Sequence, residues 1–281
     1  MSIKTIFVGP FYDASMETHA PDQALTRYAI NLAASEGAHL CVRTAVARWG
    51  APSGAFMGEV RAVVSKANSE RLDMADAYRG EVERLARAAG VSVETSALQE
   101  DFTHLIQDFA AQARLADLAV MQASDEFLSM LRGATEEVLF NSGGPVVVVP
   151  QGWSGPAQPE RAIVAWDGGA RASRALRDAV PLLSKAAQVE IVTIGGDPNP
   201  AKRIEGAEIA PRVARHCRDV RLTSLPSGGD VGEALRAHAA MTRADLIVMG
   251  AFAHNRLRQM VLGGVTRRML EAPPVPTLMS Y

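Results

Sequence analysis

The second half of this 281-residue chain repeats the order of the first, and this repeat constrains the fold more than any other feature. Residues 116–121 (ADLAVM) correspond to residues 244–249 (ADLIVM), and residues 133–135 (GAT) correspond to residues 264–266 (GVT). In each half, short apolar runs of strand length alternate with stretches of helical periodicity. Such alternation predicts right-handed crossovers and a parallel sheet that helices cover on both faces.

We therefore predict an α/β chain of two tandem, doubly wound units, each with a five-stranded parallel sheet of the Rossmann-like kind. The first unit is predicted over residues 1–150 and the second over residues 161–281. Residues 151–160 contain two glycines and two prolines, which is typical of a linker. The fifth strands, predicted at residues 146–149 and 275–279, should lie near each other about a pseudo-twofold axis. Otherwise the apolar run 146–149 would be an exposed, aggregation-prone edge.

Composition excludes several classes of function. A formal net charge of −2 gives no electrostatic basis for binding nucleic acid or an anionic membrane surface. No apolar run reaches the roughly 18–20 residues that a membrane-spanning helix needs. Cys41 and Cys217 have no motif spacing, and residues 1–5 lack the pattern of a signal peptide. We predict a globular, cytoplasmic protein with reduced thiols and no nucleic-acid or membrane partner.

The stretch after the apolar run 245–249 is the strongest candidate for a ligand site. It begins at Gly250, continues through a basic loop to Gly263 and Gly264, and enters a predicted helix at Val265. Glycines at a helix N-terminus let backbone N–H groups approach an anion closely, and the helix dipole then favours phosphate. Thr266 offers a further hydroxyl donor. The alternative interpretation is a glycine cap and a turn that only join a strand to a helix.

This stretch resembles the phosphate loop of the universal stress protein family, whose motif is glycine, two residues, glycine, nine residues, glycine, and then Ser or Thr. Gly250 and Gly263 fit the first and third glycines, whereas Ala253 stands at the second and Gly264 at the hydroxyl position. With the internal repeat, the resemblance covers the whole chain as a tandem pair. It implies the adenine nucleotide α-hydrolase-like variant of the fold. It also implies binding of ATP, with or without Mg²⁺, or of a related adenine nucleotide.

In an open parallel sheet, ligands bind beyond the carboxyl ends of the strands. The resemblance places Asp167, after the first strand of the second half, beside the nucleoside, and Ile194, at the end of the second strand, against adenine. The alternative for Asp167 is a turn former before Gly168, or a helix cap. We predict no catalytic residue and no metal ligand. The complete set of predicted nucleotide-binding residues is Ala165, Trp166, Asp167, Ile194, Met249, Gly250, Ala253, His254, Arg256, Gly263, Gly264, Val265 and Thr266.

The first half has lost the corresponding parts. Pro10 stands at the position of Asp167, and Gln122 replaces the first motif glycine. Asp125 and Glu126 would repel phosphate. We therefore predict a degenerate copy that is retained for its architecture. The alternative is a different ligand under the glycine-rich loop at residues 50–58.

The leading functional hypothesis is a sensor or regulator in stress response that acts through nucleotide binding and turns over little or no ATP. It would be an intramolecular pseudo-dimer, with homodimer formation and an unidentified protein partner as further expectations. A slow ATPase or phosphotransferase is the alternative from another class, and it would need an acid to hold a metal near the γ-phosphate. A nucleotide-free scaffold is the third. His254 and Arg256 are either phosphate contacts or exposed loop residues.

Overall fold

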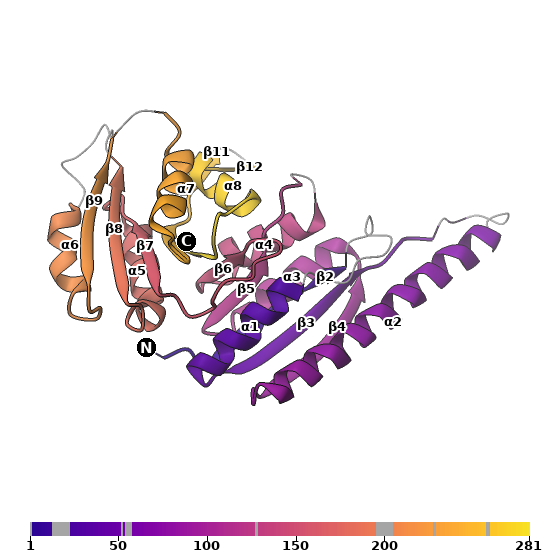
Figure 1. The fold of residues 1–281 in the computed structure, drawn as a ribbon. Helices are drawn as coiled ribbons and strands as arrows, with labels where there is room; N and C mark the ends of the chain where they lie inside the picture. Colours follow the sequence, from indigo (N-terminus) through magenta and orange to yellow (C-terminus); the bar gives the residue numbers. More distant parts are fainter. Residues whose placement is uncertain are drawn as a thin grey trace.

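The computed structural model describes residues 2–12, 23–51, 53, 58–126, 129–194, 205–226, 229–256 and 259–281, without the side chains of 253–262. Its strands form one eleven-stranded sheet and one separate two-stranded sheet (Figure 1). Along the large sheet the order is β2-β3-β1-β5-β6-β13-β10-β7-β8-β9, with β4 paired to β3. Within the described part, no helix is both long and apolar enough to cross a bilayer.

The first half builds a parallel sheet in the order third, second, first, fourth, fifth strand. Its strands are β1 (Thr5–Val8), β3 (His39–Ala47), β4 (Val93–Glu100), β5 (Leu118–Gln122) and β6 (Val146–Val149), and the two-residue β2 (Phe11–Tyr12) also pairs with β3. Its helices are α1 (Gln23–Glu36), α2 (Gly58–Ala88), α3 (Phe102–Ala113) and α4 (Met130–Asn141). The 31 residues of α2 span about 46 Å, and its first turns extend beyond the sheet (Figure 1).

The second half repeats the same order. Its strands are β7 (Arg161–Ala165), β8 (Gln188–Ile194), β9 (Val220–Leu225), β10 (Leu246–Gly250) and β13 (Thr277–Ser280). Its helices are α5 (Ala170–Leu183), α6 (Gly206–Val213), α7 (Val231–Thr242) and α8 (Gly264–Glu271). All the pairings within each half are parallel. The predicted fold class, two doubly wound five-stranded units, is therefore confirmed.

The two halves join through their fifth strands. β6 and β13 pair antiparallel, with Thr277 opposite Val148 and Met279 opposite Val146. Every residue of both strands is buried. The prediction that the two fifth strands lie near each other is confirmed. β13 begins two residues later than predicted. Pairing each fifth strand with the other leaves neither as an open edge.

Two apolar cores, one on each face of the sheet, run through both halves. Successive residues of a strand point to opposite faces. Val147 accordingly packs in the core that α1 and α5 cover, and Val146 packs in the other. Leu278 and Met279 of β13 divide in the same way. The junction between the halves is thus as well packed as the halves themselves.

The repeated Asp of the two corresponding segments has the same structural role in each half. Asp117 Oδ2 accepts the backbone N–H groups of Lys4 and Thr5, at 2.8 and 2.9 Å. Asp245 accepts those of Glu160 and Arg161, at 2.9 and 3.1 Å. Each carboxylate therefore binds the backbone at the start of the first strand of its half. Burial raises the pKa of Asp245 above its usual value.

The structure differs from the sequence-based expectation in the segment that follows β10. The predicted basic loop after β10 is a hairpin of β11 (Ala253–Arg256) and β12 (Gln259–Leu262). α6 ends at Val213 and contains Pro211 in its last turn.

Candidate functional site

The carboxyl ends of three neighbouring strands bring the predicted site residues of the second half together. β7 lies between β8 and β10, so Ala165, Ile194 and Gly250 end adjacent strands at one edge. Trp166 and Met249 are each only 4% exposed, and they pack in the cores on opposite faces of the sheet. Ala165 and Ile194 are half-buried and pack against the same core as Met249.

Asp167 forms the turn that leads from β7 into α5. Its Oδ1 accepts the backbone N–H of Gly169 at 2.8 Å, and Gly168 adopts a left-handed φ of 75°. The turn-forming interpretation of this acid therefore has a direct structural basis. The carboxylate still lies at the carboxyl edge, between the end of β7 and the start of α5.

Gly250 is required by packing as well as by any ligand. A Cβ at this position would lie 2.7 Å from the backbone N of Ala172 and 2.8 Å from the carbonyl carbon of Arg171. These are backbone atoms of α5, so they cannot move aside cheaply. The first glycine of the motif therefore lets the N-terminus of α5 pack directly against the end of β10.

The N-terminus of α8 faces the same edge and has no side-chain cap among the described residues. Gly263 is its N-cap and donates its own N–H to the carbonyl of Phe252 at 2.9 Å. Thr266, 1% exposed, accepts the N–H of Phe252 at 2.9 Å. Its hydroxyl oxygen thus holds the base of the hairpin rather than standing open to a ligand. Among the described residues, a Cβ on Gly264 would meet nothing within 4 Å, and Gly264 itself is exposed.

The corresponding helix of the first half is capped by its own sequence. Ser129 is the N-cap of α4, and its hydroxyl accepts the N–H of Arg132 at 3.1 Å. A Cβ on Gly133 would lie 2.8 Å from the ring of Phe102, so this glycine makes room for an aromatic side chain. Thr135 donates to the carbonyl of Leu131 at 3.0 Å. α4 therefore lacks the uncapped, accessible first turn that α8 retains.

The comparisons with known proteins agree with this geometry. Residues 159–280 match the model of the universal stress protein family. The C-terminal half of this chain belongs to the universal stress protein family. Among curated proteins, none matches the chain.

Solved structures extend the likeness to the whole chain. A universal stress protein from Archaeoglobus fulgidus DSM 4304 matches at 17% identity and a TM-score of 0.65, covering 98% of this chain and 97% of its own. A protein of unknown function from Pseudomonas aeruginosa PAO1 matches at 15% identity and a TM-score of 0.56, covering 99% and 92%. At these identities the likeness shows the fold alone. The first half therefore shares the fold of universal stress proteins.

Arg171 is a residue of the universal stress protein half that the sequence reasoning missed. Its guanidinium carbon lies 5.0 Å from the ring centroid of Phe252 and 4.4 Å from that of Tyr281. These cation–π contacts hold a positive charge at the carboxyl edge, beside the hairpin base. One sequence feature could have pointed to this residue: it is an arginine in the first turn of α5, where the helix dipole usually favours acidic residues.

Some predicted residues lie outside the described part. The side chains of Ala253, His254 and Arg256 are not described, although their backbone forms β11. The residues that follow Ile194, 195–204, are also outside it. Gly264 is exposed and Val265 is half-buried at the start of α8.

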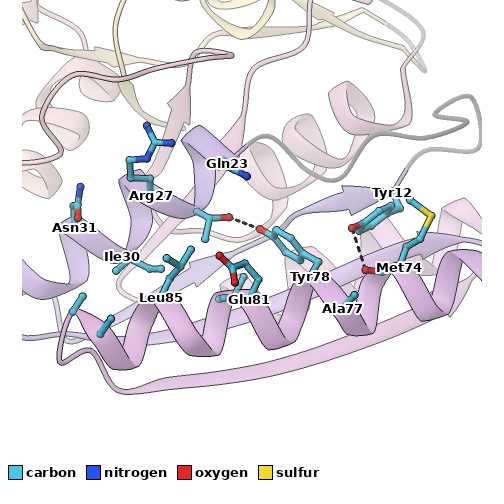
Figure 2. Close-up of a pocket in the computed structure, with 14 residues that line it drawn as sticks. Tyr12, Gln23, Arg27, Ile30, Asn31, Met74, Ala77, Tyr78, Glu81 and Leu85 are labelled. Carbon is cyan, nitrogen blue, oxygen red and sulfur yellow. Dashed lines mark hydrogen bonds between the residues drawn. The ribbon is translucent and has the colours of Figure 1, made fainter.

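A large groove lies elsewhere, between α1 and α2 (Figure 2). It has a volume of about 710 Å³, and apolar side chains such as Ile30 and Leu85 line it. Tyr78 and Thr26 share a 2.5 Å hydrogen bond along it. The counterpart between α5 and α6 measures only about 170 Å³. The candidate nucleotide site is therefore not chosen by cavity volume. It is chosen because the ends of β7, β8 and β10 and the N-terminus of α8 meet there.

Proposed function

We propose that this universal stress protein binds ATP or a related adenine nucleotide at the carboxyl edge of its second half, one per chain. The observation that carries the proposal is the N-terminus of α8, where no described side chain caps the helix and no described atom would contact a Cβ on Gly264. Unpaired N–H groups and the positive end of the helix dipole form a phosphate site. Arg171 adds a fixed positive charge at the same edge.

The nucleotide would lie across the ends of β7, β8 and β10. Its adenine would contact Ile194, its ribose would lie near Asp167, and its phosphates would accept the N–H groups of residues 264–266. The hairpin with His254 and Arg256 would cover the phosphates. Occupancy would then serve as a stress-linked signal that a protein partner reads in the cytoplasm.

We expect binding with little or no turnover. Phosphoryl transfer needs an acid to hold Mg²⁺ and a group to orient the attacking water. Among the predicted site residues the acid is Asp167, which would lie beside the nucleoside, away from the γ-phosphate, and whose carboxylate accepts the N–H of Gly169. Binding ATP without extra stabilisation of the transition state does not accelerate its hydrolysis.

The test is a calorimetric titration of ATP, with and without Mg²⁺, into the wild type and two variants of Gly263. Gly263→Asp supplies an N-cap that occupies the helix N–H groups and repels phosphate, so no binding is expected. Gly263→Ser supplies a neutral cap, so weaker binding is expected. Small side chains are chosen because a Cβ at Gly263 would lie 3.2 Å from Cβ of Phe252, and a bulky residue would disturb the loop.

The matched control is Ser129→Asp, which places the same charge at the N-cap of α4 in the first half. It should leave ATP binding unchanged, because no nucleotide is expected there. A wild type that binds no ATP, or one whose affinity survives Gly263→Asp, would refute the proposal.

A further inference from the structure

The first half carries a group of three metal-ligating side chains that the nucleotide proposal does not use. His39 and Cys41 lie on β3, and Glu94 lies on β4. A ring nitrogen of His39, Sγ of Cys41 and a carboxylate oxygen of Glu94 all lie within 4.8 Å of one another. No disulfide involves Cys41, whose thiol is free.

The pairing of β3 with β4 brings these residues together. Leu40 and Val42 alternate with the two ligands along β3 and are buried in the core that α1 covers. His39 and Cys41 therefore share the opposite face of the sheet. The parallel register places Glu94 directly beside Cys41. All three lie near the amino-terminal ends of their strands, at the edge of the sheet opposite the predicted nucleotide site.

The donor set is one that Zn²⁺ favours: an imidazole nitrogen, a thiolate sulfur and a carboxylate oxygen. Ligands around a tetrahedral Zn²⁺ lie about 3.6 Å apart, so side-chain movements of about 1 Å would close the group around an ion. His39 and Cys41 are half-buried and Glu94 is exposed, so the ion can enter from solution. The fourth position would hold water.

Ser92 orients the histidine of this group. Its Oγ lies 2.9 Å from Nδ1 of His39, and its carbonyl accepts the N–H of Leu40 at 2.9 Å. A hydrogen bond to the ring nitrogen that does not bind the metal is the usual support of a ligating histidine. In the tautomer whose Nδ1 donates to Ser92, the lone pair for the metal lies on Nε2.

The second half provides an internal comparison. By strand register, Gln188, Glu190 and Arg221 occupy the positions of His39, Cys41 and Glu94. Arginine cannot ligate a cation and repels it. Glu190 is already paired with His238, at 3.1 Å. The donor set is therefore a property of the first half.

We propose that His39, Cys41 and Glu94 bind one Zn²⁺ per chain, in a site that is independent of the nucleotide. On binding, Zn²⁺ replaces the proton of the Cys41 thiol, and that proton passes to solvent.

The test is a titration of the tag-free, full-length protein with Co²⁺ in the absence of nucleotide. Tetrahedral Co²⁺ bound to a thiolate shows a charge-transfer band in the near ultraviolet together with visible d–d bands. We expect both at one equivalent of Co²⁺, and we expect Zn²⁺ to displace them. Cys41→Ser should abolish the charge-transfer band, and Ser92→Ala should weaken affinity roughly tenfold.

Cys217→Ser is the matched control, because Cys217 is the other cysteine and lies in the second half. It should leave the titration unchanged. The group Glu100, Asp101 and His104, the other one found among the described residues, contains no sulfur, so Co²⁺ bound there gives no thiolate band. A spectrum without that band, a band that survives Cys41→Ser, or one lost in Cys217→Ser would overturn the proposal. Circular dichroism of each variant without metal checks its fold.

Discussion

At the residue scale, two glycines of the same loop differ in the room that the structure leaves for a side chain. A Cβ at Gly250 would meet the backbone of α5, whereas a Cβ at Gly264 would meet no described atom within 4 Å. The motif expects glycine at the first position and Ser or Thr at the second. The structure separates the glycine that packing requires from the one that leaves the N-terminus of α8 accessible.

Alanine substitutions should distinguish these two positions. Gly250→Ala would place a methyl group 2.7 Å from the N atom of Ala172, so the free energy of unfolding should fall by about 1–3 kcal/mol. The methyl group of Gly264→Ala would meet no described atom within 4 Å, and restricting the unfolded chain should raise that free energy by about 0.4–1 kcal/mol. Urea denaturation of both variants measures the difference. Equal effects, or a larger loss for Gly264→Ala, would contradict the assignment.

The residues that sequence reasoning could not find are those that depend on register. Cys41 and Glu94 are 53 positions apart, and nothing in the periodicity of either strand predicts that they lie side by side. Arg171 was missed because its aromatic partners, Phe252 and Tyr281, come from distant parts of the chain. The turn at Asp167 could be predicted, because the Asp-Gly pair is a local signal.

At the element scale, strands and helices with strong periodicity could be predicted, and weakly patterned ones could not. Most strands of each half are apolar runs bounded by turn residues, so their order along the chain was readable. β2 has only two residues, and the hairpin of β11 and β12 has no Asn-Gly or Asp-Gly signal at its turn. A basic loop was therefore the natural expectation there.

The contact between α4 and α8 across the two halves depends on a buried arginine. Arg132 is 2% exposed, and its Nε lies 2.5 Å from Glu136. Its Nη1 lies 3.6 Å from Glu271 of α8, and neither terminal nitrogen has a hydrogen-bond partner within the described part. The desolvation free energy of a buried guanidinium offsets much of the stabilisation that its ion pairs contribute.

Two variants test this balance. Arg132→Met removes the buried charge, so the free energy of unfolding should change by less than about 1 kcal/mol or rise. Glu136→Ala leaves the guanidinium with only the distant Glu271, so a loss of about 1–3 kcal/mol is expected after allowing for the partial exposure of Glu136. Denaturant unfolding at neutral pH compares them. A larger loss for Arg132→Met would show that the ion pairs outweigh desolvation.

At the scale of the whole molecule, a nearly symmetric framework carries asymmetric chemistry. Both halves have the same strand order and share two continuous cores across the junction of β6 and β13. The helix that follows the fourth strand is capped by Ser129 in the first half and begins at Gly263, without a described side-chain cap, in the second. The account therefore requires one nucleotide per chain, bound in the second half.

Photolabelling with 8-azido-ATP, followed by peptide mapping, tests this requirement most directly. The azide is on adenine, so the label should appear in the peptide that contains Ile194, at one label per chain. Gly263→Asp should remove the label, and excess ATP should compete with it. A label in the first half, for example on Tyr78 in the groove between α1 and α2, or two equal labels per chain, would contradict the account.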